Sequence, residues 1–268
     1  VCGDYFVDAS GDGEVSAWSG APYTYGAERD DITLWCSFGK FHGGDREASR
    51  QYLTVVDQRS IEDTTRAIVA GRRQPGILGE AEYPQHYLVA RESRHIQAPT
   101  RIRYVDMLMD VDYHDAAFIC RANVDLKGLG SSDASLAGFV EPKILGNFYT
   151  HVPFSAMVPL GLRNVIVAGK AYSITHDGLA MARMQSDMIT MGGVAGAAVD
   201  YVRRRHIGFM EASVPELQRV WQEIGCIEPH ELMPRRDHEE HGMNDLDIQL
   251  LCQRMGLGPV EMDDEARL

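Results

Sequence analysis

The stretch from Asn164 to Tyr201 constrains the fold more than any other part of the chain. Asn164 to Ala168 is a short apolar run rich in valine and isoleucine, and Gly169 follows it directly. Such a run is typical of a buried parallel strand that ends in a tight turn. From about Gln185 to Tyr201 the composition predicts a helix with a face of small residues, namely Gly192, Gly193, Ala195, Gly196 and Ala197. This order predicts a nucleotide or cofactor crevice at the carboxyl end of the strand, although ordinary helix–sheet packing gives the same pattern.

The composition is that of a globular protein with one large or two small domains. The chain has 268 residues, of which 44% are hydrophobic and 24% are charged. Its net charge of -13 argues against binding to nucleic acid phosphates and to anionic membranes. No apolar run is long enough to span a bilayer, and no signal peptide is recognisable. We therefore expect a cytoplasmic protein without a membrane span.

The cysteines and histidines do not form a metal-binding pattern. The five cysteines are widely spaced, without a Cys-x-x-Cys pair, and free thiols are expected at Cys2, Cys36, Cys120, Cys226 and Cys252. The segment from His238 to His241 has its histidines three residues apart, whereas the zinc motif His-Glu-x-x-His needs four. A solvated polar face is the better interpretation of that segment, and no metal site is predicted.

A second strand, glycine turn and helix occur at the start of the chain. Tyr5 to Ala9 is a β-favouring run, the turn Ser10-Gly11-Asp12-Gly13 follows, and Glu14 to Ser19 is typical of a short helix. The acidic Asp12 argues against a simple phosphate site in this turn. Hydrogen bonding to a ribose or flavin fits better, with a plain solvent-exposed turn as the alternative.

The remaining pattern predicts a mixture of helices and strands, and so a mixed α/β fold. Ser60 is expected to cap a helix that runs through Ala70, and Ser213 a helix that runs to about Ile224. Tyr104 to Met109 fits either a helix or a strand. The predicted strands are Ile32–Phe41, Tyr52–Asp57, Tyr87–Ala90, Ala116–Val124 and Phe148–Pro153. Lys127–Ser135 is predicted to be a loop, and small helices are expected after Glu228.

Three segments of the chain, taken in order, resemble the FAD-dependent oxidoreductases of the two-dinucleotide-binding superfamily. The first is Val7-Asp8-Ala9-Ser10-Gly11-Asp12-Gly13-Glu14-Val15 with Ser19-Gly20-Ala21-Pro22, and the second is Arg91-Glu92-Ser93-Arg94-His95-Ile96. The third comprises Val152-Pro153-Phe154-Ser155, Val158-Pro159 and Asn164 through Ala198. The resemblance implies a Rossmann-like FAD-binding domain with an inserted β-rich substrate domain.

The sequence departs from the family pattern at one feature. Members of this superfamily carry Gly-x-Gly-x-x-Gly in a first βαβ unit, and this sequence has no such fingerprint. We therefore expect a partner polypeptide, or a further part of the same one, to supply the N-terminal half of the FAD site. The implied domains are residues 1–31 with 155–205 for FAD, 32–154 for substrate, and 206–268 as a helical extension.

The resemblance implies FAD as cofactor and assigns roles to particular residues. The residues implied to bind FAD are Ser10, Gly11, Asp12, Gly169, Lys170, Gln185, Ser186, Asp187 and Met188. His176 is implied as the catalytic residue that handles a proton, with Arg183 as a second catalytic candidate that holds an anion. Arg91 and His151 are implied to bind substrate, with Glu92 as an ion-pair partner of Arg91. For each of these side chains a structural or solvated role is the alternative.

The implied function is hydride transfer from a small organic substrate to flavin, by a subunit or C-terminal half of an oxidoreductase. An unidentified electron acceptor would reoxidise the flavin. A different class of function is also open: a degenerate, non-catalytic flavoprotein half that serves as a scaffold or interaction subunit. The acidic tail and the absent glycine fingerprint favour the scaffold, whereas the retained glycines and His176 favour the enzyme.

Overall fold

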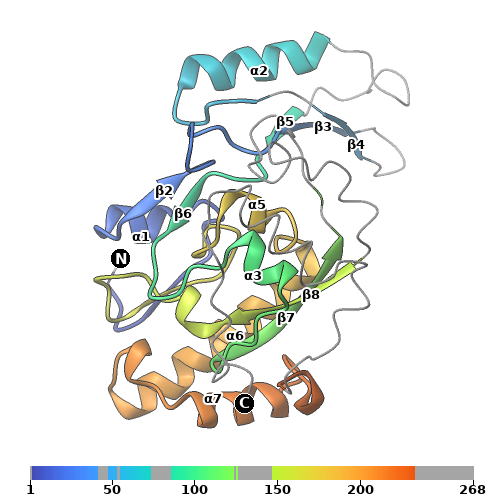
Figure 1. Cartoon of the computed structure of the whole chain (residues 1–268). Helices are drawn as coiled ribbons and strands as arrows, with labels where there is room; N and C mark the ends of the chain where they lie inside the picture. Colours follow the sequence, from blue (N-terminus) through green and yellow to red (C-terminus); the bar gives the residue numbers. More distant parts are fainter. Residues whose placement is uncertain are drawn as a thin grey trace.

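The computed structural model describes residues 2–41, 48–52, 55–73, 86–123, 125 and 147–232. Within them, helices alternate with short strands in small sheets, as the predicted mixed α/β class requires (Figure 1). The predicted Lys127–Ser135 loop, the segment from His238 to His241, and Cys252 lie outside the described residues. None of the described helices is long and apolar enough to cross a membrane.

The two predicted strand–turn segments meet in one parallel sheet. β1 (Phe6–Asp8) pairs in parallel with β9 (Val165–Val167), with Phe6 opposite Val165 and Asp8 opposite Val167. All three β9 residues are buried, which is typical of a parallel strand covered on both faces. Because both strands run in the same direction, the loops that follow them leave the sheet at the same end. The pairing confirms the predicted parallel strand at Asn164–Ala168.

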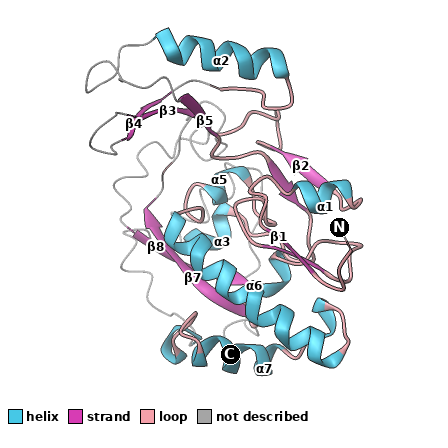
Figure 2. Ribbon diagram, turned by 180° about the vertical axis from the view of Figure 1, so that it is seen from behind, coloured by secondary structure: helices cyan, strands magenta, loops and turns pink. Residues whose placement is uncertain are grey.

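Helix α6 (Gln185–Arg205) covers the sheet and connects it to the rest of the core. Figure 2 shows α6 running beside β1 and β7 (Ala116–Asn123), with α7 (Val214–Glu223) below it. Its buried face carries the small and apolar side chains Met191, Val194, Ala195, Ala198 and Val202. The Trp221 indole of α7 donates to the Val194 carbonyl at 3.2 Å, which fixes α7 against α6. The predicted helices at Gln185–Tyr201 and after Ser213 are confirmed.

Three antiparallel sheets and several short helices complete the described chain. β2 (Tyr23–Tyr25) pairs with β6 (Arg94–Ile96), and β7 (Ala116–Asn123) pairs with β8 (Asn147–Pro153). β3 (Ser37–Phe41) lies between β4 (Ala48–Tyr52) and β5 (His86–Val89). The other helices are α1 (Glu14–Trp18), α2 (Ile61–Arg73), α3 (Tyr104–Leu108) and α5 (His176–Leu179), with 3-10 turns at Phe154–Ala156, Phe209–Glu211 and Pro229–Leu232.

Two strand predictions were wrong at their boundaries, and hydrogen bonding explains both. The strand predicted at Ile32–Phe41 begins only at Ser37, because the Leu34 N–H donates to the Glu92 carboxylate. The strand predicted at Tyr52–Asp57 ends at Tyr52. The Asp57 N–H donates to the Asp63 side chain and its carbonyl accepts from the Ser60 N–H, so this residue belongs to the turn before α2.

One large hydrophobic core runs through most of the described chain. It joins residues as far apart as Ala21 and Ile227 and includes fully buried Tyr172, Phe118 and Trp221. A second, small core consists of Cys36, Val56 and the α2 residue Ala67. The division into an FAD domain, a substrate domain and a helical extension stays a prediction.

Candidate functional site

The carboxylate of Asp8 organises the loop at the end of β1. Asp8 is 1% exposed and accepts hydrogen bonds from the hydroxyls of Ser10 (2.6 Å) and Ser16 (2.7 Å). It also accepts from the backbone N–H groups of both serines. Burial alone would raise the pKa of Asp8, but these four donors outweigh it and lower the pKa. Predicted cofactor residue Ser10 therefore contributes to the shape of this loop.

The loops after β1 and β9 approach each other through glycines. Gly11 and Gly169 have φ values of 89° and 149°, and a side chain at Gly169 would lie 3.8 Å from the Gly11 Cα. The Lys170 ammonium joins the two loops by donating to the Gly11 carbonyl at 2.5 Å and to the Asp12 carboxylate. Burial would raise the pKa of Asp12, but the Lys170 charge and hydrogen bond help to lower it. The structure thus brings together Gly11, Asp12, Gly169 and Lys170, and their predicted role in FAD binding stays a prediction.

The first turn of α6 presents backbone donors without a side-chain cap. The N-cap residue is Met184, and no side chain caps the helix there. Gln185 and Ser186 are exposed, whereas Met188 is partly buried. Asp187 is buried at 5% exposure, and its burial raises the pKa of the carboxyl despite hydrogen bonds from Cys120 and backbone groups. The carboxylate of Asp187 thus already lies at the positive end of this 21-residue helix, and a further negatively charged group would share that end with it.

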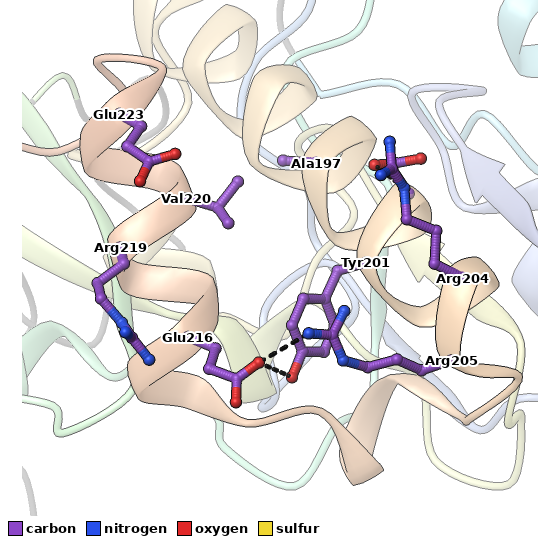
Figure 3. A pocket seen from close by; sticks show the side chains of 9 residues that line it. Ala197, Tyr201, Arg204, Arg205, Glu216, Arg219, Val220 and Glu223 are labelled. Carbon is purple, nitrogen blue, oxygen red and sulfur yellow. Dashed lines mark hydrogen bonds and ion pairs between the residues drawn. The ribbon is translucent and has the colours of Figure 1, made fainter.

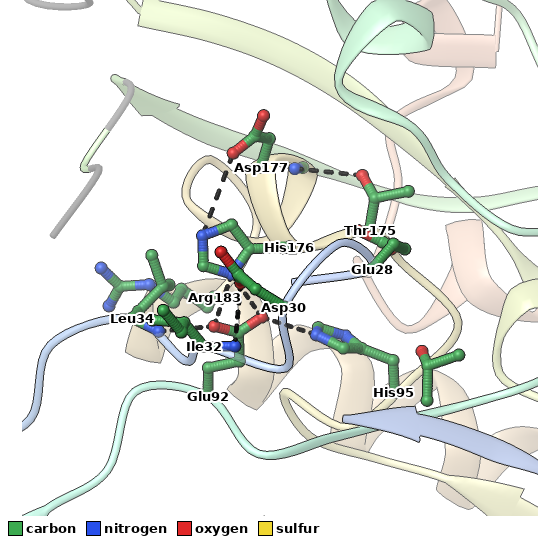
Figure 4. A network of polar contacts seen from close by, with 12 residues as sticks. Glu28, Asp30, Ile32, Leu34, Glu92, His95, Thr175, His176, Asp177 and Arg183 are labelled. Carbon is green, nitrogen blue, oxygen red and sulfur yellow. Dashed lines mark hydrogen bonds and ion pairs between the residues drawn. The ribbon is translucent and has the colours of Figure 1, made fainter. Parts of the chain in front are cut away.

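Glu92 is the centre of a buried polar cluster (Figure 4). Its carboxylate accepts from the Leu34 N–H at 2.6 Å and lies 2.6 Å from His95 Nε2. His176 Nδ1 lies 2.7 Å and 2.9 Å from the two carboxylate oxygens. Glu92 is 0% exposed, and burial alone would raise its pKa. The hydrogen bonds from His176 and His95 outweigh burial and lower the pKa of Glu92 to about 2.

His176, one of the two histidines that contact Glu92, is the first residue of α5. Thr175 caps the helix by accepting from the Gly178 N–H. Burial alone would lower the pKa of His176, but Glu92, with smaller contributions from Asp177 and Glu28, raises it. The second ring nitrogen, Nε2, is buried and has no hydrogen-bond partner among the described residues. A nitrogen in that condition is suited to accept a proton or hydrogen bond from a bound molecule.

The two arginines predicted to hold anions have different surroundings. The Arg183 guanidinium donates to the Asp125 carboxylate at 2.8 Å and to its carbonyl at 3.0 Å. Its Nε is buried without a hydrogen-bond partner in the described part of the chain, and burial lowers the pKa of Arg183. Arg91 donates to the Trp35 carbonyl at 2.6 Å and to the Ser37 hydroxyl. The Glu92 carboxylate was predicted to pair with Arg91, but its main contacts are with His95 and His176.

His151 lies on β8 and belongs to a different set of contacts. Its Nε2 lies 2.6 Å from the Glu231 carbonyl, and its Nδ1 lies 3.3 Å from the Asp112 carboxylate. The ring is 4% exposed. These contacts connect the central strands to the 3-10 turn at Pro229–Leu232, and none of them is shared with the Glu92 cluster. Substrate binding by His151 and Arg91 stays a prediction.

A groove between α6 and α7 is a separate feature of the surface (Figure 3). The Glu216 carboxylate accepts from the Tyr201 hydroxyl and the Arg205 guanidinium, both at 2.9 Å. Arg204 pairs with Asp200 at 2.8 Å. Two ion pairs thus lie in this groove, which contains none of the predicted site residues.

The comparison with protein families decides the affiliation of the chain. A family model described as FAD dependent oxidoreductase matches residues 80–220, which is more than half of the sequence. The chain belongs to the FAD-dependent oxidoreductase family. The matched span contains Glu92, His95, His176 and the whole of α6. Comparisons with curated proteins and with solved structures give no match.

FAD is the cofactor of this family, and the residues present fit such a group. The crossing of Gly11 and Gly169 leaves backbone without side chains at the carboxyl end of the parallel sheet, which is where nucleotides bind in α/β folds. The uncapped N-terminus of α6 supplies donors for negative charge. Lys170 is already held by Asp12 and Gly11, so it would contribute to a phosphate only by exchanging these partners.

Sequence reasoning missed the roles of Glu92, His95 and Asp8. The segment Arg91-Glu92-Ser93-Arg94 directs attention to local pairing between adjacent opposite charges. The available signal was the histidine three residues after Glu92, because a hydrogen bond to a carboxylate often fixes the orientation and tautomer of a histidine. Asp8 was visible as an acidic residue at the end of an apolar strand, two residues before a serine.

Proposed function

We propose that this FAD-dependent oxidoreductase transfers a hydride from a small organic substrate to flavin while His176 accepts a proton from the substrate. The observation that carries the proposal is the state of His176: Nδ1 is bound by Glu92, and Nε2 is buried without a hydrogen-bond partner among the described residues. An imidazole in this state has a lone pair available for a substrate hydroxyl. When bound, FAD supplies the two-electron acceptor of the reaction.

In this proposal the residues of the chain bind and orient the substrate and the cofactor, and one of them accepts a proton. His176 Nε2 takes the proton of the hydroxyl as the adjacent carbon gives up its hydride, so the substrate loses two electrons and becomes a carbonyl compound. Arg183, with its buried Nε, is proposed to bind a negatively charged group of the substrate or cofactor. Gly11, Gly169 and the first turn of α6, with Gln185, Ser186, Asp187 and Met188, are proposed to form one wall of the FAD site. An electron acceptor then reoxidises the cofactor.

We further propose that a polypeptide carrying the Gly-x-Gly-x-x-Gly unit completes the FAD site. The sequence contains no such fingerprint. Among the described residues, β1 pairs only with β9, so one edge of β1 has backbone groups that a further parallel strand would satisfy. In this proposal the chain is one part of the catalytic unit.

The proposal is tested with the FAD-loaded protein, isolated together with any polypeptide that it binds. Under anaerobic conditions, a set of small hydroxy compounds is mixed with the wild type and with His176→Asn, and bleaching of the flavin absorbance is followed. We expect His176→Asn to slow reduction by about 100-fold or more with the compound that reduces the wild type. His206→Asn, at the exposed C-cap of α6, is the matched control and should keep its rate. Equal rates in the wild type and His176→Asn would exclude His176 as the base, whereas a wild type whose flavin is reduced by none of the compounds would favour a scaffold role.

A further inference from the structure

The cluster around Glu92 contains a feature beyond the presence of a candidate base. Two imidazoles from distant segments share one buried carboxylate: His95 Nε2 at 2.6 Å from Oε1, and His176 Nδ1 at 2.7 Å from Oε2. The Leu34 N–H donates to Oε2 as well, at 2.6 Å. The carboxylate is thus held from three directions by a loop, a strand and a helix, as Figure 4 shows.

We propose that Glu92 is the positioning residue of His176: its carboxylate keeps the imidazole proton on Nδ1 and leaves Nε2 as the proton acceptor. His95 and Leu34 hold the carboxylate in the orientation that this requires. The inference rests on the proposed function, because it explains how His176 is prepared to act as a base. It also identifies Arg91-Glu92-Ser93-Arg94-His95 as a segment whose second and fifth residues serve the site.

The tautomer follows from the chemistry of the contacts. An ionised carboxylate only accepts hydrogen bonds, so the Nδ1 atom that lies 2.7 Å from it must carry a proton. In the neutral ring the remaining nitrogen then has a free lone pair. Nε2 of His176 is that nitrogen, and its nearest described acid is Asp177, with Oδ1 at 4.0 Å. The ring therefore points its accepting atom away from Glu92.

Other charged groups around His176 come from its own helix α5 and from two further segments. Asp177 belongs to α5, Glu28 and Asp30 belong to the loop after β2, and Arg183 follows α5. His95 faces His176 only through Glu92. Among these groups Glu92 alone forms a direct hydrogen bond with His176 in the described contacts. A change at Glu92 should therefore alter His176 more than a change at Glu28.

The test is nuclear magnetic resonance of the full chain with nitrogen-15 in its histidines, which requires neither substrate nor cofactor. Long-range proton–nitrogen correlations report which nitrogen of His176 loses its proton as the pH rises. We expect Nε2 to lose it while Nδ1 stays protonated. Deprotonation of Nδ1 in the wild type would overturn the proposal, and this arm needs no variant that has to fold.

The second arm compares Glu92→Gln with Glu28→Gln. Glu92→Gln keeps a hydrogen-bond acceptor but removes the charge, so the pKa of His176 should fall clearly, whereas Glu28→Gln should lower it much less. Glu92→Asp, which keeps the charge, should retain part of the raised pKa. An unchanged His176 pKa in a folded Glu92→Gln protein would overturn the inference.

Two outcomes separate this inference from the proposed function. If the tautomer and pKa behave as expected but His176→Asn keeps the rate of flavin reduction, the positioning is real and the proposed base is wrong. If His176→Asn loses the rate but Glu92→Gln moves neither the tautomer nor the pH at which the rate rises, then His176 acts without Glu92. The inference predicts a third pattern: Glu92→Gln shifts the rising limb of the pH–rate profile to lower pH.

Discussion

His176 Nδ1 lies 2.7 Å from a carboxylate oxygen of Glu92, although the two residues are 84 positions apart in the sequence. Both side chains are buried, at 2% and 0% exposure. A buried charge is costly unless it is paired and hydrogen-bonded, so this contact matters for folding as well as for the proposed chemistry. It joins the Arg91–His95 segment to the loop and helix that lead into α6.

The pH dependence of stability should follow this pair. Glu92 has a lowered pKa, so its contribution to the free energy of unfolding is present above about pH 4.5 and is lost as the pH falls toward about 2. His176 has a raised pKa, so its contribution is complete below about pH 6.5 and is lost as the pH rises through the folded-state value. The joint contribution is therefore largest between these limits.

Urea unfolding at a series of pH values measures this effect. In Glu92→Gln the free energy of unfolding should change less with pH, both toward acid and toward alkaline pH. Glu92→Ala should lower the free energy of unfolding by about 3–5 kcal/mol near pH 6, the usual cost of leaving one member of a buried pair without its partner. Glu28→Gln is the control, since it removes a carboxylate that contributes little to His176. A pH profile of Glu92→Gln that matches the wild type would contradict the account.

Asp8 should be a second position of high sensitivity. Its buried carboxylate accepts four hydrogen bonds from the hydroxyls and backbone N–H groups of Ser10 and Ser16. In asparagine an NH2 group replaces one carboxylate oxygen, so its two N–H bonds would face serine groups that are themselves hydrogen-bond donors. We expect Asp8→Asn to lower the free energy of unfolding by about 2 kcal/mol or more. Asp4→Asn, at an exposed position before β1, should leave it nearly unchanged. Equal denaturant midpoints for the two variants would show that the Asp8 network does not support the loop.

Gly13 and Gly20 form a matched pair for testing how closely the first loop is packed. Both have positive φ values, 68° and 94°, so alanine strains the backbone at either position. A methyl group at Gly13 would also lie 2.9 Å from the buried Ile96 side chain, whereas nothing lies within 4 Å at Gly20. Thermal unfolding should show a loss of about 1 kcal/mol for Gly20→Ala and at least about 2 kcal/mol for Gly13→Ala. A smaller loss at Gly13 would contradict the packing described.

The glycines of α6 should respond differently to alanine. Gly192 lies in open space on the helix surface, so Gly192→Ala should stabilise the chain by up to about 1 kcal/mol through helix propensity. A methyl group at Gly193 would lie 3.0 Å from the Cys226 sulfur, and part of that gain should be lost. Denaturant titration of both variants measures the difference. Destabilisation by Gly192→Ala would mean that this face of α6 is covered.

Sequence patterns predicted the parts of the fold that depend on local order. The apolar run at β9 was recognisable, because burial leaves a composition that can be read directly. The helix α6 was recognised too, although Ala195 alone among its named small residues is buried, and Gly192 and Gly196 face open space. The resemblance implied that Gly11 and Gly169 both bind FAD, which stays a prediction, and the structure places the two glycines close together. The helix at Tyr104–Leu108 could not be told from a strand in the sequence, because an apolar run of that length fits both.

The partners of Glu92 could not be predicted, because they come from segments far apart in the chain. Leu34 and His176 are separated from Glu92 by 58 and 84 positions. Adjacent arginines made a local ion-pair network the obvious hypothesis, yet Arg91 donates to Trp35 and Ser37. The same long-range contact shortened the predicted strand at Ile32–Phe41, because Glu92 accepts the Leu34 N–H that a longer strand would need.

The visible absorption spectrum of the protein tests the central claim most directly. The chain is purified from its native host, together with any polypeptide that it binds, and the cofactor released on denaturation is identified. The account predicts the absorption bands of bound flavin and the release of FAD. A folded preparation, complete with its binding partner, that contains no flavin would contradict it.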